Sequence, residues 1–318
     1  MVKKNNFNAK NLLNYKEIFI ALIIFIALYF FVPNFYSYEN FFSIVTQISI
    51  LSFFAFAVTF PGLIKEFDLS VGATAGLSST LIAVLVNNNM GLPQAILIGV
   101  AVALVCGLLN GFLVIDIGIS AIIVTIGTGF VFNAFELILN GGRRVVAPMA
   151  MTALTTKSFG PIPIYFIFGF FMVLVLYFFS LWTTMGRSIY ATGENKTAAK
   201  FSGIKVRMYG YMCFVGAAFL AALGGIFAVS HSGTAQVQGG DKFLWDSFIA
   251  YFIGVSFFRG KRLFVGTYVG VIFTVIIGQV MILVGVEFYY VQLFRAIILV
   301  LAIIISTPIS LRRRIKRA

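Results

Sequence analysis

Apolar runs of about twenty residues alternate with short polar breaks along almost the whole chain. Such runs predict helices that cross a bilayer, because lipid offers no hydrogen-bond partner to unpaired backbone groups. The eighth run is short enough to be re-entrant instead, and that alternative stays open. We expect ten spans, over about Phe19–Val32, Phe42–Pro61, Val71–Val86, Pro93–Val114, Ser120–Leu139, Ile164–Trp182, Tyr209–Val229, Leu244–Phe258, Leu263–Val284 and Val291–Ile309.

These spans predict an all-α polytopic membrane protein with one transmembrane domain. The domain extends over residues 19–310, between an N-terminal tail (1–18) and a basic C-terminal tail (311–318). Composition agrees, since 60% of the 318 residues are hydrophobic and only 10% are charged. In a typical soluble protein about a quarter of the residues are charged. The chain is therefore built for a lipid bilayer.

The longest polar segment, Gly186–Val206, lies between the sixth and seventh spans, inside a loop over residues 183–208. Asn195 predicts a helix N-cap, Lys196–Ser202 the helix, and Gly203 its left-handed end. A short, capped, basic helix between two spans is suited to contact with a soluble partner. An ordinary positively charged loop is the alternative. One face of the predicted helix carries Ala198, Phe201 and Ile204.

The net charge of +13 is expected to follow membrane topology rather than nucleic-acid binding. With both termini in the cytoplasm, 18 of the 23 basic residues fall on the inner side. This asymmetry agrees with the positive-inside rule. The pair Arg143 and Arg144, in a long outer loop, runs against it.

Catalytic and metal-binding motifs are missing from the sequence. No phosphate-binding loop occurs, so the chain cannot hydrolyse ATP by that route. His231 is the only histidine, which argues against a histidine metal site. Asp68 and Asp116 are expected in water-exposed turns or helix caps at the inner span ends. Glu136 is the only carboxylate well inside a predicted span, which makes it a functional candidate.

Several segments resemble one family in order and spacing. DLSVG (68–72), NGFLV (110–114), IIVTIGTGF (122–130) and the long block GRSIYATGENKTAAKFSGIKV (186–206) are similar to blocks of the bacterial ATP-binding-cassette (ABC) sugar-importer permeases. The likeness is to the ribose, xylose, arabinose and galactose type, within the branched-chain amino acid/sugar permease superfamily. The resemblance implies structural roles for the signature residues Asp68, Ser70, Gly72, Asn110, Gly111 and Gly127.

The same resemblance implies partners and a mechanism. The 183–208 segment corresponds to the family's cytoplasmic coupling loop, which docks on a separate ATPase subunit that binds ATP and Mg²⁺. A second permease copy or paralogue and an extracytoplasmic sugar-binding protein are also implied, in the bacterial inner membrane. No cofactor, metal or catalytic residue is expected on this chain. The residues expected to couple to the ATPase are Gly193, Glu194, Asn195, Ala198, Ala199, Phe201, Gly203 and Ile204.

The chain also departs from the family pattern. Ser120 and Ala121 replace the usual Pro-Ala or Pro-Phe pair, and most glycines expected between Gly254 and Leu263 are absent. If those glycines allow close helix approach, packing there must be rearranged.

A polar stripe on the fifth span indicates the class of solute. Thr125, Thr128, Phe132 and Glu136 recur at helical spacing. Two hydroxyls, an aromatic ring and one carboxylate suit the path of a small uncharged sugar. Packing of small residues between helices is the alternative explanation of the stripe.

Two other function classes fit the sequence less well. An ion-gradient-driven secondary transporter of a small polar solute has similar broken spans, but the chain lacks a series of buried carboxylates for an ion relay. A membrane-embedded enzyme needs a polar catalytic cluster at one depth, which one histidine and scattered acids do not supply.

Overall fold

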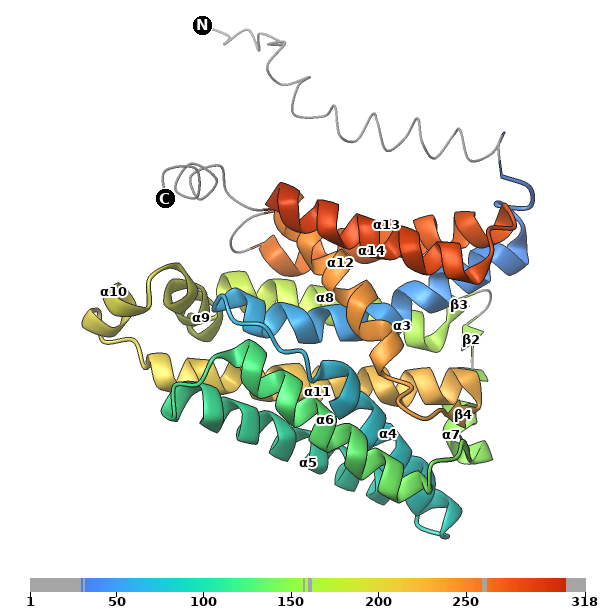
Figure 1. Cartoon of the computed structure of the whole chain (residues 1–318), viewed down its shortest axis with the longest axis horizontal. Coiled ribbons are helices and arrows are strands. Elements are labelled where there is room, and N and C mark those ends of the chain that lie inside the picture. The colour runs from blue at the N-terminus through green and yellow to red at the C-terminus, as the bar shows by residue number, and fades with distance from the viewer. Residues whose placement is uncertain (1–29, 31, 157, 160–161, 259–261, 307–318) are drawn as a thin grey trace, which may run out of the picture.

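A computed structural model of the chain describes residues 30, 32–156, 158–159, 162–258 and 262–306. The predicted first span, Phe19–Val32, lies outside the described residues except for residues 30 and 32, and so do the tails 1–18 and 311–318. The described part is a bundle of helices with two short strand pairs (Figure 1).

The long helices are α3 (Tyr38–Leu63), α4 (Val71–Asn87), α5 (Leu92–Gly111) continued by the π-helical turn η1 (Phe112–Asp116), α6 (Ala121–Asn140), α8 (Ile164–Trp182), α11 (Val206–Ser232), α12 (Asp241–Phe257), α13 (Leu263–Leu283) and α14 (Phe288–Ser306). The shorter helices are α7 (Met149–Thr156), α9 (Thr184–Glu194) and α10 (Lys196–Phe201). Strand β1 (Val145–Val146) pairs antiparallel with β4 (Thr234–Ala235), and β2 (Ser158–Phe159) pairs antiparallel with β3 (Ile162–Pro163).

Helices occupy the second to ninth predicted spans, with ends within a few residues of the predicted ones. Helix α14 occupies the tenth as far as Ser306, and residues 307–309 of that span lie outside the described residues. Six of them are long and apolar enough to cross a membrane: α3, α5 with η1, α6, α8, α11 and α13. Helices α4 and α14 are apolar but shorter over their apolar stretches. A polytopic all-helical protein is therefore confirmed. The number of ten spans and the inside–outside orientation stay predictions.

Helix α4 lies in the middle of the bundle and is buried along most of its length. It is rich in small residues, which let neighbouring helices approach closely. A Cβ atom on Gly76 would meet the carboxyl group of Glu136 on α6. A Cβ on Gly225 of α11 would collide with the backbone of Ala75. The sequence of α4 therefore matches a helix covered by protein rather than by lipid.

The largest apolar core joins α3 and α11 with their neighbours. Phe54 and Phe56 on α3 and Ala217 on α11 belong to it and are all 0% exposed. Gly224 of α11 packs directly against the Phe54 ring. This core fixes the two longest helices against each other.

Helices α12 and α13 also pack closely, although most of the family's glycines between them are missing. Gly254 of α12 lies against the backbone of Gly266 on α13, and Gly270 lies against the backbone of Ala250. Close helix approach here thus depends on Gly254, Gly266 and Gly270.

The two ends of the bundle are different. Helices α9 and α10 project from one end, while α7 and the β1–β4 pair lie at the opposite end (Figure 1). The α9–α10 end carries the exposed basic residues Lys65, Arg187, Lys196, Lys200, Lys205 and Arg207.

Candidate functional site

The polar segment between α8 and α11 folds into two helices. The Thr183 hydroxyl oxygen caps α9 by accepting a hydrogen bond from the Gly186 amide at 2.9 Å. Asn195 caps α10, with its Oδ1 3.0 Å from the Ala198 amide nitrogen. Gly203 follows with a φ of 79°. The predicted helix, its cap and its left-handed glycine are confirmed, whereas α9 is a helix that the sequence pattern did not predict.

Helix α10 turns most of its surface away from the rest of the chain. Phe201 is 88% exposed although it is large and apolar, while Ala199 is only 5% exposed and holds α10 against the bundle. The other exposed residues of α10 are Lys196, Thr197, Ala198 and Lys200. In the predicted face, Ile204 is half-buried and Ala198 and Phe201 are open. An exposed ring on a capped, basic helix is suited to contact with another protein.

The connection between α3 and α4 supports α9 and α10. Gly193 of α9 packs so closely on the last carbonyl group of α3 that a Cβ atom would not fit there. The Lys65 ammonium donates to the Glu194 carbonyl at 3.4 Å. Glu66 also lies here: burial raises the pKa of its carboxyl group, and the Lys196 ammonium opposes that shift. A displacement of α9 and α10 therefore reaches the α3–α4 connection directly.

Buried hydrogen bonds continue from that connection into three helices. Asp68 Oδ1 accepts bonds from the Ser70 amide at 2.8 Å and the Ser70 hydroxyl at 2.6 Å. Asn110 at the end of α5 donates to the Ser70 hydroxyl at 2.8 Å, and Thr128 of α6 donates to Asn110 Oδ1 at 2.7 Å. Thr125 accepts from a backbone amide of the same connection at 3.0 Å. We call Asp68, Ser70, Asn110 and Thr128 the polar network.

The two aspartates at this end have different environments. Asp68 is only 2% exposed, so the expected water-exposed turn is wrong: its carboxylate accepts from the amide and the hydroxyl of Ser70, the residue before α4, inside the protein. Burial raises the pKa of Asp68, and the bonds from Ser70 oppose that shift. Asp116 instead pairs with Arg207 at 2.6 Å and accepts from the Tyr211 hydroxyl at 2.6 Å.

The signature glycines occupy contrasting positions. A Cβ atom on Gly72 would meet the backbone of Asp241, and one on Gly111 would meet the Tyr211 ring at 2.9 Å. A Cβ atom on Gly127 would meet nothing within 4 Å, whereas one on Gly129 would lie 3.6 Å from Ser70. Gly129 therefore faces the start of α4, where a Cβ atom would make only an ordinary contact, and Gly127 does not.

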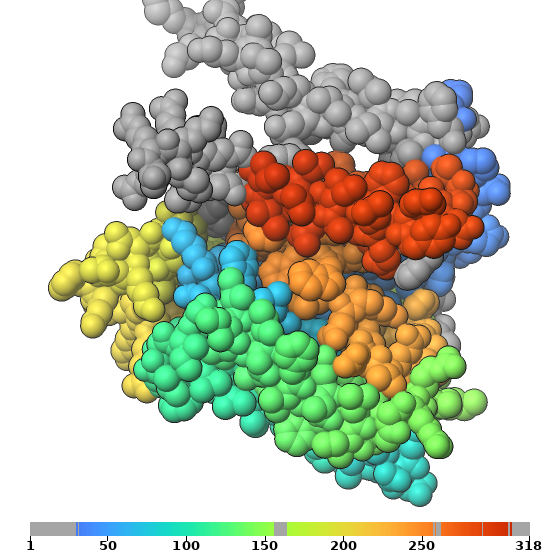
Figure 2. Space-filling view, in the orientation of Figure 1, coloured from blue at the N-terminus to red at the C-terminus, as the bar shows by residue number. Residues whose placement is uncertain are grey.

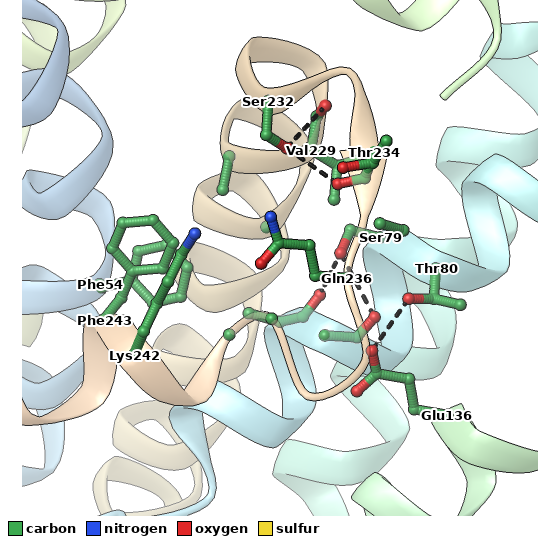
Figure 3. A pocket seen from close by; sticks show the side chains of 17 residues that line it. Phe54, Ser79, Thr80, Glu136, Val229, Ser232, Thr234, Gln236, Lys242 and Phe243 are labelled. Carbon is green, nitrogen blue, oxygen red and sulfur yellow. Dashed lines mark hydrogen bonds between the residues drawn. The ribbon is translucent and has the colours of Figure 1, made fainter. Parts of the chain in front are cut away.

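Glu136 lies at the other end of the stripe and lines a narrow polar cavity between α4, α6, α11 and α12. Thr80 of α4 donates to Glu136 Oε1 at 3.1 Å. Figure 3 shows Glu136 and Thr80 on one side of the cavity, Lys242 beside two phenylalanine rings on the other, and Gln236 between them. The volume open to the centre of a water molecule is about 20 Å³, roughly one water position. A sugar enters this cavity only if the helices separate.

The structure does not bring the four stripe residues into one cavity. Thr125 and Thr128 are hydrogen-bonded near the α3–α4 connection, as helix packing predicts. Phe132 packs against Leu77 and Cys106, beside an apolar groove between α4, α5 and α6. Only Glu136 lines the polar cavity, so the solute path along α6 stays a prediction.

Sequence reasoning missed two polar contacts of α12. Asp246 pairs with Arg295 of α14 at 2.8 Å, and Asn133 of α6 donates to Asp241 at 3.0 Å. Opposite charges in two predicted spans were the available signal, but the order of the spans in space was needed to pair them. Among the described residues, no group of three or more His, Cys, Asp or Glu side chains could hold a metal ion.

The sequence matches the family described as branched-chain amino acid transport system / permease component over residues 40–306. It is 27% identical over 276 residues to the autoinducer 2 import system permease protein LsrC of Salmonella paratyphi B, covering 86% of this chain and 80% of that one. It is 32% identical over 196 residues to the autoinducer 2 import system permease protein LsrD of the same organism, covering 59% and 58%. No solved structure matches the chain significantly. This chain therefore belongs to the family of branched-chain amino acid transport system permease components, as a multi-pass transport subunit rather than an enzyme.

Proposed function

We propose that this chain is the membrane subunit of an ABC importer that carries a small uncharged sugar, pentose- or hexose-like, across the bacterial cytoplasmic membrane. A separate subunit binds ATP and Mg²⁺ and hydrolyses the nucleotide. Family membership and the autoinducer 2 import names of the relatives support the importer class. The few charged residues along the spans support an uncharged cargo.

The observation that carries this proposal is the exposed helix α10. Its aromatic residue Phe201 is 88% exposed, and α10 also carries the exposed basic residues Lys196 and Lys200. Full burial of a phenylalanine side chain yields about 1.5–3 kcal/mol, which makes Phe201 a strong anchor for a protein groove. The docking partner is the ATPase.

Movement of the ATPase passes to the spans through the contacts of α9 and α10. Gly193 and Glu194 touch the α3–α4 connection, and the polar network ties that connection to α4, α5 and α6. ATP shifts the balance between inward- and outward-facing states only through contacts that differ between the two. The network is a suitable route because its members come from separate elements.

Further partners complete the importer. A second permease copy or paralogue forms the other half of the membrane domain, and an extracytoplasmic binding protein delivers the sugar. The binding protein docks at the end that carries α7 and the β1–β4 pair, opposite α10.

Cysteine cross-linking tests the docking role of α10. A cysteine at Phe201 is expected to cross-link to the phosphate-loop ATPase encoded beside this chain, when the two are co-expressed in membranes. Val146 is 69% exposed at the opposite end, and a cysteine there is the matched control without a product. Equal cross-linking from both positions, or none from Phe201, would contradict docking through α10.

A further inference from the structure

A second cavity, separate from the one at Glu136, lies between α12 and α14. Its volume is about 390 Å³, within the range of small-molecule sites. Its polar and aromatic lining comes from Lys242, Trp245, Asp246, Gln292 and Arg295. Figure 2 shows α12 between α14 and α6 on one face of the molecule. Helix α12 thus separates this cavity from α6, and all of its lining residues come from α12 and α14.

The ion pair in this cavity presents donors and acceptors side by side. Arg295 Nη1 donates to Asp246 Oδ2 at 2.8 Å, and the two side chains keep 29% and 15% of their surface exposed. The guanidinium group has further N–H donors, and Asp246 Oδ1 is a further acceptor. Charges at membrane depth are costly and usually mark functional positions. Since two neighbouring hydroxyls of a sugar also pair a donor with an acceptor, they fit the edge of this ion pair.

Trp245 supplies an apolar surface beside the ion pair. Its side chain is 55% exposed, and its ring centroid lies 6.4 Å from that of Phe248. Anchoring at the membrane–water interface is the common role of a tryptophan near the end of a span. Its place in the lining of a cavity that also holds Asp246 and Arg295 gives it a second use, because a sugar ring packs its C–H face on an aromatic face.

Lys242 of α12 lines both this cavity and the narrow one. Its ammonium lies 5.0 Å from the centre of the Phe243 ring. The two cavities are separate but have this one lining side chain in common.

We propose that the α12–α14 cavity binds a small neutral cyclic polyol, a sugar in its ring form, with adjacent hydroxyls on Asp246 and Arg295 and its ring on Trp245. The identity of the ligand rests on the uncharged cargo proposed above. An amino acid zwitterion is the competing ligand chemistry, since its two charges match Arg295 and Asp246. It has to separate an ion pair already closed at 2.8 Å, whereas a polyol bonds to the outer edge of that pair.

Tryptophan fluorescence tests this site without any partner. The chain has only two tryptophans, Trp182 and Trp245. Trp182 is 73% exposed at the end of α8, so Trp182→Phe leaves the α12–α14 cavity intact and Trp245 as the single reporter. The full chain in lipid nanodiscs is titrated with D-ribose and D-xylose, with glycerol and L-leucine in parallel. A saturable change with a pentose, and none with glycerol or leucine, is expected.

Two matched variants complete the test. Trp245→Phe, which keeps Trp182 as the reporter, is expected to lose the response. The double variant Asp246→Asn with Arg295→Gln, in the Trp182→Phe chain, is expected to lose saturation while its sugar-free spectrum is kept. No response to either pentose up to its solubility limit, or a response to leucine instead, would overturn the proposal. The titration uses the chain without its ATPase, so it tests the site separately from transport. If a separate assay shows ATP-driven uptake but Trp245 fluorescence does not respond to either pentose, this site is refuted and the proposed function stands.

Discussion

Replacing Ser70 with alanine removes the hydroxyl group that joins Asp68 to Asn110. Two hydrogen bonds are lost, at 2.6 Å to Asp68 Oδ1 and at 2.8 Å from Asn110 Nδ2. Asp68 is 2% exposed and Asn110 is 1% exposed, so water does not replace the lost partner. The hydrogen bond that the Ser70 backbone amide donates to Asp68 remains in the variant.

The expected loss of stability follows from these two contacts. Interhelical hydrogen bonds in membrane proteins average about 0.6 kcal/mol, whereas a bond to a charged group contributes about 1.5–3 kcal/mol. Ser70→Ala should therefore lower the free energy of unfolding by about 2–3.5 kcal/mol. The measurement is reversible unfolding of the purified chain in mixed micelles.

Ser52→Ala is the matched control. Ser52 is 0% exposed, and within the described part of the chain its hydroxyl bonds only to the Ile48 carbonyl of its own helix. The Ile48 carbonyl also accepts a backbone hydrogen bond within the helix, so it keeps a partner when the Ser52 hydroxyl is removed. Ser52→Ala should therefore lower the free energy of unfolding by less than about 1 kcal/mol. Equal destabilisation by the two variants would refute the reasoning that the polar network, rather than buried hydroxyls in general, joins α4, α5 and α6.

Three further outcomes are expected. Gly203→Val should insert normally yet lower substrate-stimulated ATP turnover, because its φ of 79° disfavours a β-branched residue by about 1 kcal/mol or more; full turnover would contradict the coupling role. Phe201→Ser should weaken ATPase binding roughly 30-fold, for a loss of about 2 kcal/mol, while unfolding of the isolated chain stays unchanged; an affinity equal to wild type would exclude Phe201 as an anchor. Single cysteines at Asn88 and Ala153 should react with an impermeant thiol reagent from outside sealed cells, and one at Lys200 should not; labelling at Lys200 would reverse the orientation.

The helices were predictable because apolar run length is a local property. Val71 starts α4 and Ile164–Trp182 forms α8 as the pattern indicated. The cap at Asn195 and the glycine at Gly203 are equally local signals. Helix α9 was missed because its glycines and threonines are typical of a loop, and its Thr183 cap was not recognised.

The remaining features depend on contacts between distant parts of the chain. The burial of Asp68 requires Asn110 and the end of α5 to meet the start of α4. The pair of Asp246 and Arg295 requires α12 to lie beside α14. Helical periodicity gives the face on which a residue lies but not the helix that this face meets. For the same reason the stripe on α6 could not be divided in advance into packing residues and a cavity residue.

ATP-dependent uptake of radiolabelled pentose into proteoliposomes is the most direct test of the proposed import function. The vesicles contain this chain, any paralogue encoded beside it, and the neighbouring ATPase, with the binding protein and pentose on the side opposite to ATP. Uptake should require hydrolysable ATP, persist when ionophores abolish all ion gradients, and fall with Phe201→Ser. Uptake that continues without ATP and stops when the ion gradients are removed would instead identify a secondary transporter.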